Sequence, residues 1–300
     1  MEETSLREPA LGVESLGQLR VGAPMWAHKP WVGTYFPADT PAGHELAAYA
    51  TWCTTVEGNT TFYATPTPDT VARWAADAPD DLRFCCKLPK HLTHERRLRN
   101  IADGLDTFLD ALEPLHANLG PIQLQLPASF GPDDLPVLAD TIRHLPTAFD
   151  WAVEVRHPDF FVGGASERPL DDLLADLGVN RVILDSRALF TRPPETRAEH
   201  EAWENKPRVP VRPVATASQP IVRLIGQRDL DDDLDHWQPW VTKIADWVRA
   251  GISPHVCTHT PDNDHALPLA RRFHALVAAE VPELAPLPEP LRPETQLDLF

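Results

Sequence analysis

Thr54-Thr-Val-Glu-Gly-Asn59 and Leu82-Arg-Phe-Cys-Cys-Lys-Leu88 are two largely apolar runs with the length and residue types of buried strands. A helix-like run lies between them. Thr67 is suited to cap this helix, and Pro68 stands at its first position. A strand, a helix and a second strand in this order predict two parallel strands joined by a helical crossover.

The same alternation repeats along the chain and gives eight strand-like runs, each followed by a helix-like run. This pattern predicts an α/β fold, a single-domain TIM-like (β/α)8 barrel over residues 19–281. We expect residues 1–18 to form a flexible N-terminal segment and residues 282–300, rich in proline and glutamate, a flexible tail. A polar, proline-rich stretch at residues 186–219 predicts one long loop inside the barrel.

Composition narrows the class of protein. The 300 residues include no apolar run long enough for a membrane span, and the acidic N-terminus lacks a signal pattern, so we expect a cytoplasmic protein without a membrane partner. The four cysteines form no C-x-x-C pair and are expected to be buried free thiols. A net charge of −17 argues against strong direct nucleic-acid binding.

Polar residues follow nearly every predicted strand, and the carboxyl ends of barrel strands converge on one face, where TIM-barrel active sites lie. Carboxylates and cations mixed at this face favour binding of a small anionic molecule and proton transfer, with paired charges that serve only the structure as the alternative. The candidate catalytic residues are Glu57, Lys87, Glu154 and Asp185. The candidate substrate-binding residues are Asn59, Tyr63, His94, Gln125, Arg156, His157, Arg223 and His259.

The sequence assigns no metal ligand and no cofactor. A divalent metal is still conceivable, because His157 and His259 could join the carboxylates, but no tight ligand spacing is present. The segment Lys90–Arg97 is the clearest basic patch, and it could either hold a phosphate or be a solvated loop.

Several motifs occur together in a characteristic order. They are Val56-Glu57-Gly-Asn59-Thr-Thr-Phe62-Tyr63, Lys87-Leu-Pro89-Lys-His91-Leu-Thr93-His94, Gln123-Leu-Gln125-Leu-Pro127, Glu154-Val-Arg156-His157-Pro158, Leu184-Asp185-Ser186 and Val222-Arg223. Over Val21 to Val277 the chain resembles the family known as domain of unknown function 72. The resemblance implies a β/α barrel and no established reaction.

The last five residues are Gln296, Leu297, Asp298, Leu299 and Phe300. They resemble the pentapeptide with which bacterial proteins bind the DNA sliding clamp. A flexible linker would present a polar anchor and an apolar cluster to a partner, although the same cluster could instead dock on its own barrel.

Three functions are therefore open. The first is an enzyme, hydrolase or isomerase/lyase-like, acting on a small anionic or phosphate-bearing substrate. The second is a clamp-recruited DNA maintenance factor, with a nuclease-like barrel as one form of it. The third is a non-catalytic adaptor. A ligand in the barrel mouth would separate the first two from the third, and clamp binding would identify the second.

Overall fold

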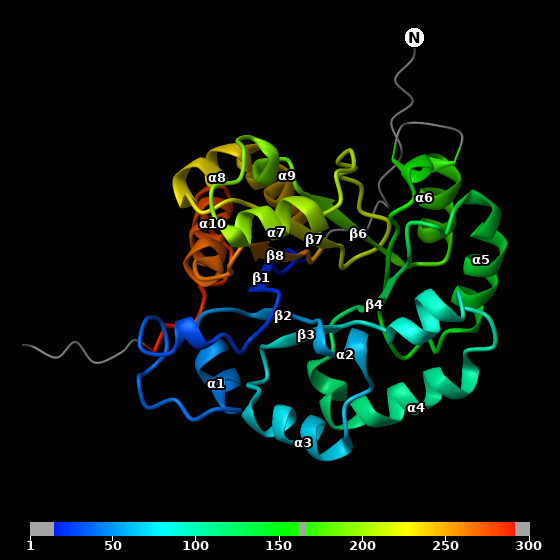
Figure 1. Ribbon diagram of the computed structural model, residues 1–300, viewed down its shortest axis with the longest axis horizontal. Helices are drawn as coiled ribbons and strands as arrows, with labels where there is room; N and C mark the ends of the chain where they lie inside the picture. Colours follow the sequence, from blue (N-terminus) through cyan, green and yellow to red (C-terminus); the bar gives the residue numbers. More distant parts are fainter. Residues whose placement is uncertain (1–14, 162–165, 292–300) are drawn as a thin grey trace, which may run out of the picture.

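A computed structural model describes residues 15–161 and 166–291 and contains eight parallel strands arranged as a barrel (Figure 1). The strands are β1 (Arg20–Ala23), β2 (Thr55–Gly58), β3 (Arg83–Cys86), β4 (Ile122–Gln125), β5 (Trp151–Glu154), β6 (Asn180–Asp185), β7 (Ile221–Ile225) and β8 (His255–His259). Their order is β3-β2-β1-β8-β7-β6-β5-β4. Isolated parallel bridges, Phe84 to Leu119 and Lys87 to Gln123, link β3 to β4 and bring the barrel close to closure.

Helices surround these strands, so the TIM-like (β/α)8 barrel predicted from the sequence is confirmed (Figure 1). They are α1 (Glu45–Tyr49), α2 (Thr60–Tyr63), α3 (Pro68–Asp77), α4 (Ala102–Leu112), α5 (Leu135–His144), α6 (Glu167–Asp176), α7 (Arg197–Asn205), α8 (Leu230–His236), α9 (Gln238–Arg249) and α10 (Ala266–Glu280). The Thr67 side chain caps α3, as predicted. No helix in the described ranges is long and apolar enough to cross a membrane.

Strand parity divides the side chains between the barrel interior and the layer beneath the helices. The outer layer is apolar and includes the buried tryptophans at the beginning of α9 and along it, Trp237, Trp240 and Trp247. The interior is largely polar. At the amino-terminal ends of β2 and β8, the Thr55 hydroxyl lies 2.8 Å from His255 Nδ1. The barrel interior therefore contains buried ionic and polar side chains, and an apolar layer between the strands and the helices surrounds it.

The stretch 186–219 differs from the single loop that its composition predicts, because α7 lies within it. Thr196 accepts a hydrogen bond from the Glu199 backbone, and the Glu199 carboxylate accepts one from the Thr196 backbone, which together form a capping box. Ala202 of α7 packs in one buried cluster with Leu184 of β6 and Ile225 of β7. This short helix thus covers the carboxyl ends of two strands.

The segment from residue 282 to 291 lies against the barrel, in contrast to the flexible tail expected there. Leu284 and Leu287 pack on the main core, the Arg271 guanidinium donates to the Pro288 carbonyl, and the Leu291 amide donates to Thr51 Oγ1. At the other end of the chain, the Gly17 amide donates to the Val248 carbonyl. The pentapeptide 296–300 lies outside the described residues.

Candidate functional site

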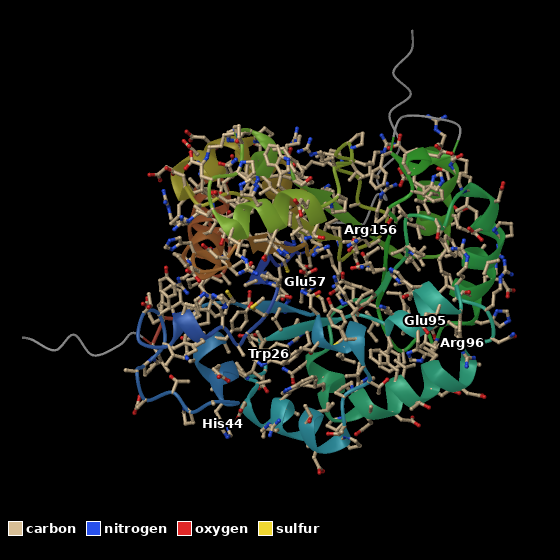
Figure 2. All side chains as sticks on the ribbon, in the orientation of Figure 1. Trp26, His44, Glu57, Glu95, Arg96 and Arg156 are labelled. Atoms are coloured by element: carbon tan, nitrogen blue, oxygen red, sulfur yellow. The ribbon has the colours of Figure 1, made fainter. Side chains whose placement is uncertain are left out.

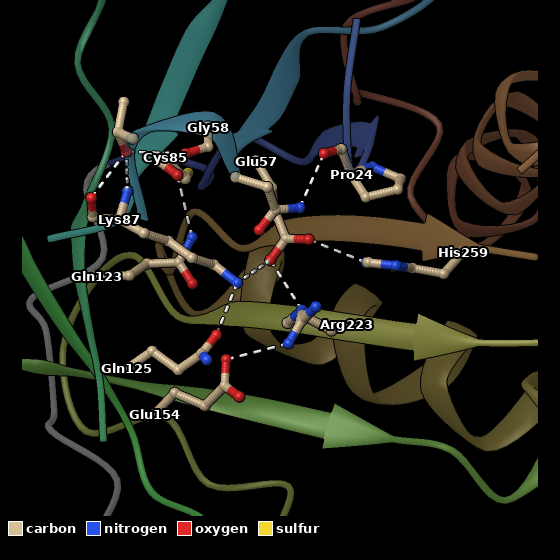
Figure 3. A network of polar contacts seen from close by, with 12 residues as sticks. Pro24, Glu57, Gly58, Cys85, Lys87, Gln123, Gln125, Glu154, Arg223 and His259 are labelled. Atoms are coloured by element: carbon tan, nitrogen blue, oxygen red, sulfur yellow. Dashed lines mark hydrogen bonds and ion pairs between the residues drawn. The ribbon is translucent and has the colours of Figure 1, made fainter. Parts of the chain in front are cut away.

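Glu57, at the end of β2, is the centre of a buried ionic cluster inside the carboxyl end of the barrel (Figure 3). Its Oε1 atom lies 2.8 Å from Arg223 Nε and 3.8 Å from Lys87 Nζ, and its Oε2 atom lies 3.0 Å from His259 Nε2. The side chain is fully buried. Four strands, β2, β7, β8 and the end of β3, therefore bring three nitrogen-bearing groups to one carboxylate.

Arg223 joins Glu57 to a second carboxylate. Its Nη1 atom donates to Glu154 Oε2 at 3.1 Å, and Glu154 Oε1 accepts from Arg156 Nε at 2.8 Å. Arg223 is buried, whereas Arg156 is 28% exposed. Arg156 is therefore the cation through which this cluster faces solvent.

Lys87 extends the cluster towards β4, where its ammonium donates to Gln125 Oε1 at 2.9 Å. The neighbouring Gln123 amide donates to the Cys85 carbonyl, but its buried Oε1 atom has no hydrogen-bond partner within residues 15–161 and 166–291. Gln125, one of the predicted binding residues, therefore lies beside this cluster and contacts the Lys87 ammonium group.

The cluster's electrostatics fix its charge at neutral pH. Burial would raise the pKa of Glu57, but Arg223, Lys87 and His259 outweigh it and hold that pKa well below its usual range. In the same way Arg223, Arg156 and Lys87 overcome burial and lower the pKa of Glu154 to about 2. Both carboxylates are therefore ionised at neutral pH. A ligand that approaches them also meets the positive charges of Arg223, Arg156 and Lys87.

His259 is neutral in this setting. Burial lowers its pKa to about 3, although Glu57 acts in the opposite direction. The Nε2 atom of this ring lies 3.0 Å from Glu57 Oε2, but among the described residues neither atom has a partner with hydrogen-bond geometry. Burial and Arg223 also lower the pKa of Lys87. The site thus combines two fixed anions with cations whose charge is costly to keep buried.

Asp185 does not join this cluster, in contrast to its predicted role as a catalytic neighbour of Glu57. Its carboxylate accepts from Trp240 Nε1 of α9 at 2.8 Å and from the Arg187 guanidinium. Arg181, four residues earlier on β6, bonds outward to Asp171 of α6. Residues 181 and 185 share strand parity, so both side chains point to the helical layer, and the sequence alternation contained this signal.

Four other predicted binding residues lie around the mouth in different settings. The Asn59 amide donates to the Pro24 carbonyl, and the His94 ring lies edge-on to Phe62 with centroids 5.1 Å apart. Tyr63 is 78% exposed, and His157 Nδ1 accepts from the Asp159 amide. The first two brace the rim of the site, Tyr63 faces solvent, and His157 is engaged in its own turn.

The predicted basic patch is a π-helical turn, His91–Glu95, with flanking residues, and part of its charge is used locally. Arg97 pairs with Asp134 at 2.6 Å, and Arg96 donates to the Asn100 carbonyl. Figure 2 shows Arg96 away from Glu57, towards the outer helices, whereas Arg156 lies nearer to Glu57. Arg96 and Arg97 therefore lie apart from the buried cluster, whereas His94 of the same turn is close enough for Arg156 and Glu154 to act on its pKa.

A metal ion has little place in this cluster. Within residues 15–161 and 166–291, no group of three histidine, cysteine or acidic side chains is arranged to hold one. Glu57 and His259 are the two cluster residues that could contribute metal ligands. Arg223 and Lys87 already lie against the Glu57 carboxylate, and their positive charges would repel a metal cation there.

Lys206, just after α7, is a residue that strand-end reasoning missed. It is half-buried, and burial followed by the charge of Arg223 lowers its pKa to about 8, with Glu57, Lys87 and Glu154 also acting on it. The available signal was helical spacing, since Glu199, Ala202 and Lys206 recur on one face of a stretch that looks like a polar loop.

The fold and the cluster define a class, a (β/α)8 barrel with a buried ionic network of Glu, Arg, Lys and His at the carboxyl ends of its strands. Crystal structures share this barrel: a DUF72 family protein from Thermotoga maritima has a TM-score of 0.64 at 18% identity and covers 87% of this chain and 99% of that one. A DUF72 family protein from Enterococcus faecalis has a TM-score of 0.62 at 15% identity, with 89% and 97% coverage.

Sequence similarity identifies the family. Residues 20–296 match the family described as a protein of unknown function, DUF72, and the chain belongs to it. The UPF0759 protein YecE of Escherichia coli K12 is 39% identical over 268 residues, which are 89% of this chain and 96% of that protein. The protein of the same name from Escherichia coli O157:H7 is equally similar. The resemblance predicted from the strand-end motifs is confirmed.

Proposed function

We propose that the carboxyl end of the barrel binds a small anionic, phosphate-bearing or carboxylate-bearing substrate and is the active site of an enzyme. The observation that carries this proposal is the excess of cations in the cluster. Lys87, Arg156 and Arg223 surround two carboxylates, Glu57 and Glu154, so the cluster keeps a net positive charge. Such an excess in a region of low dielectric attracts an anion.

Arg156 is the residue best placed to meet this anion. Its guanidinium is partly exposed while one edge is held by Glu154, so the remaining donors are free to make a two-point contact with an oxyanion. The Glu154 pair fixes the plane of the guanidinium before the ligand arrives. Preorganisation of this kind lowers the entropic cost of binding.

The reaction class that fits the site is proton transfer coupled to anion stabilisation, as in hydrolases and in isomerases or lyases. Glu57 is an ionised acceptor and Lys87 is a donor 3.8 Å away from it. The cations would stabilise negative charge that develops on the substrate. The four free, buried cysteines fit the cytoplasmic setting that we propose for this activity.

Sulfate titration by calorimetry tests the proposal with a matched pair of variants. Arg156 and Arg187 each follow a strand and pair with a carboxylate two residues before them, but only Arg156 faces the cluster. Arg156→Ala should weaken sulfate binding roughly tenfold or more, and Arg187→Ala should leave it unchanged. Absence of binding in the wild type, or equal binding in all three proteins, overturns the proposal.

A second proposal concerns Gln296-Leu-Asp-Leu-Phe300. We propose that this pentapeptide recruits the protein to a bacterial DNA sliding clamp. The family match ends at residue 296, so all but the first residue of the peptide lie beyond the shared domain. A short sequence added to a family domain is typical of a partner-binding element, and tethering would offset the repulsion between an acidic protein and DNA.

A fluorescent peptide covering the last residues tests the recruitment. It should bind a bacterial sliding clamp, and Phe300→Ala should weaken that binding by about 2 kcal/mol or more, because a few apolar anchors carry most of a peptide's affinity. A peptide that does not bind at high micromolar concentration refutes the recruitment and leaves the barrel activity untouched.

A further inference from the structure

Helix α7 lies over the carboxyl ends of β6 and β7, and its position is set by packing. Ala202 is buried against Leu184 and Ile225, two residues that end their strands. The Ser186 hydroxyl, just after β6, donates to the Pro207 carbonyl at 2.7 Å. Figure 1 shows α7 in front of the strands. The middle of α7 and Pro207, just beyond its C-terminal end, are thus held at the rim of the barrel.

Lys206 extends this cover to the ionic cluster. Its backbone amide donates to the Ala202 carbonyl at 2.9 Å, so Lys206 lies one helical turn beyond the buried alanine and on the same face. The charges of Arg223, Glu57, Lys87 and Glu154 act on its ammonium group, and that group in turn acts on His259. These residues come from five different strands or strand ends around the mouth.

The Lys206 ammonium group has no carboxylate within ion-pair distance among the described residues. Glu199, on the same face of α7, is engaged by its own cap and by Arg192. Glu57 and Glu154 are occupied by Arg223 and Arg156. A half-buried ammonium without a counter-ion costs free energy, and an anionic ligand would remove that cost.

We propose that Lys206 is a substrate-binding residue, carried by the α7 cover, whose ammonium group pairs with the anion held at the mouth. This inference rests on the proposed function and adds a fourth cation to Lys87, Arg156 and Arg223. The anion would lie between the strand-end cations and α7. Because α7 is short and joined by loops on both sides, the same contact would order the cover over a bound substrate.

The protonation of Lys206 gives the proposal a distinct signature. Its pKa of about 8 means that the ammonium loses its proton as the pH rises through the mildly alkaline range. Anion affinity in the wild type should therefore be highest below that pKa and fall above it. Arg223 and Arg156 keep their charge over this range because guanidinium groups titrate far higher. The groups facing Lys206 that could also change are Lys87 and His259, and His259 is already neutral.

The experiment is sulfate titration of the full chain between about pH 6.5 and pH 9.5, a range in which sulfate keeps its charge. Lys206→Met should bind sulfate roughly 10- to 100-fold more weakly than the wild type at the acidic end, and the two should converge at the alkaline end. Lys206→Arg should bind as tightly as the wild type at the acidic end and keep that affinity at the alkaline end. Lys243→Met, which removes the same charge from the outer helix α9, should leave the whole profile unchanged.

Thermal melting separates binding from a structural role. Because the ammonium is held at a cost, Lys206→Met should keep or raise the melting temperature, whereas loss of a structural contact would lower it. Wild-type affinity in Lys206→Met, or an alkaline decline that persists in Lys206→Arg, overturns the assignment of Lys206 and leaves the proposed function standing. A wild type that binds no sulfate at any pH rejects the proposed function itself.

Discussion

Replacing Arg223 by methionine should destabilise the protein strongly, because Arg223 is the cation shared by two buried carboxylates. Its Nε lies 2.8 Å from Glu57 and its Nη1 3.1 Å from Glu154. Methionine fills much of the same volume without charge, so the main loss is electrostatic. Removal of one partner from a buried ion pair costs about 3–5 kcal/mol. For a chain of 300 residues this corresponds to a drop in melting temperature of roughly 5–8 °C.

The pH dependence of this loss gives a sharper test. In the wild type the folded pKa of Glu154, about 2, and that of Glu57 lie below their values in the unfolded chain. Their contribution to stability is therefore present above the unfolded pKa and lost as the pH falls through the folded pKa. In Arg223→Met burial dominates and raises both pKa values, so acidification stabilises the variant relative to the wild type.

The melting temperatures of the wild type and Arg223→Met should therefore differ most near neutral pH and approach each other near about pH 5. Arg197→Met serves as the control, since that arginine is 94% exposed and its partner Glu201 is 61% exposed, so its removal should cost about 1 kcal/mol or less. A change of less than about 2 °C in Arg223→Met, or an equal loss at both pH values, would refute the assignment of Arg223 as the shared counter-ion.

Three further predictions use other parts of the chain. Asp185→Asn should lower the melting temperature by a few degrees, since Trp240 and Arg187 lose a charged acceptor, but should leave sulfate affinity intact in calorimetry. The His259 ring should stay neutral down to about pH 4 in NMR titration, and a ring that protonates near neutral pH would contradict its placement against the buried cluster. Deleting residues 296–300 should abolish clamp binding without moving the melting temperature, whereas a marked drop would identify the peptide as a structural strap.

The barrel could be predicted from the sequence because its strands are buried on both faces and its longer helices each have one apolar face. The nearly continuous apolar run Ile221–Ile225 indicates a strand buried on both faces, and the tryptophans at helical spacing in α9 indicate one buried helix face. Helix α7 was not predicted, because only Ala202 and Glu199 of this helix are buried and its other residues are largely charged. Its capping box at Thr196 and Glu199 was the local signal, and composition masked it.

The candidate site could be predicted as a set of strand-end residues, but strand-end position alone does not say which face a side chain takes. Glu57, Glu154 and Arg223 point inward, whereas Asp185 points to α9. Alternation along β6 gives Arg181 and Asp185 the same face, because these two residues lie two strand periods apart. Lys206 shares the helical spacing of Glu199 and Ala202, but that spacing does not show that α7 packs across the mouth, because this packing is a tertiary contact.

The location of the cationic excess is informative because the protein as a whole carries a charge of −17. An acidic surface repels extended polyanions, which need many cations in a row, and favours binding of anions small enough to enter a confined positive region. Arg156 and Lys206 are the cations of this region that reach towards solvent, while Lys87 and Arg223 are buried beneath them. Charge distribution therefore favours a small anion at the mouth over nucleic acid laid across it, and any approach to DNA would have to come through a separate element such as the C-terminal pentapeptide.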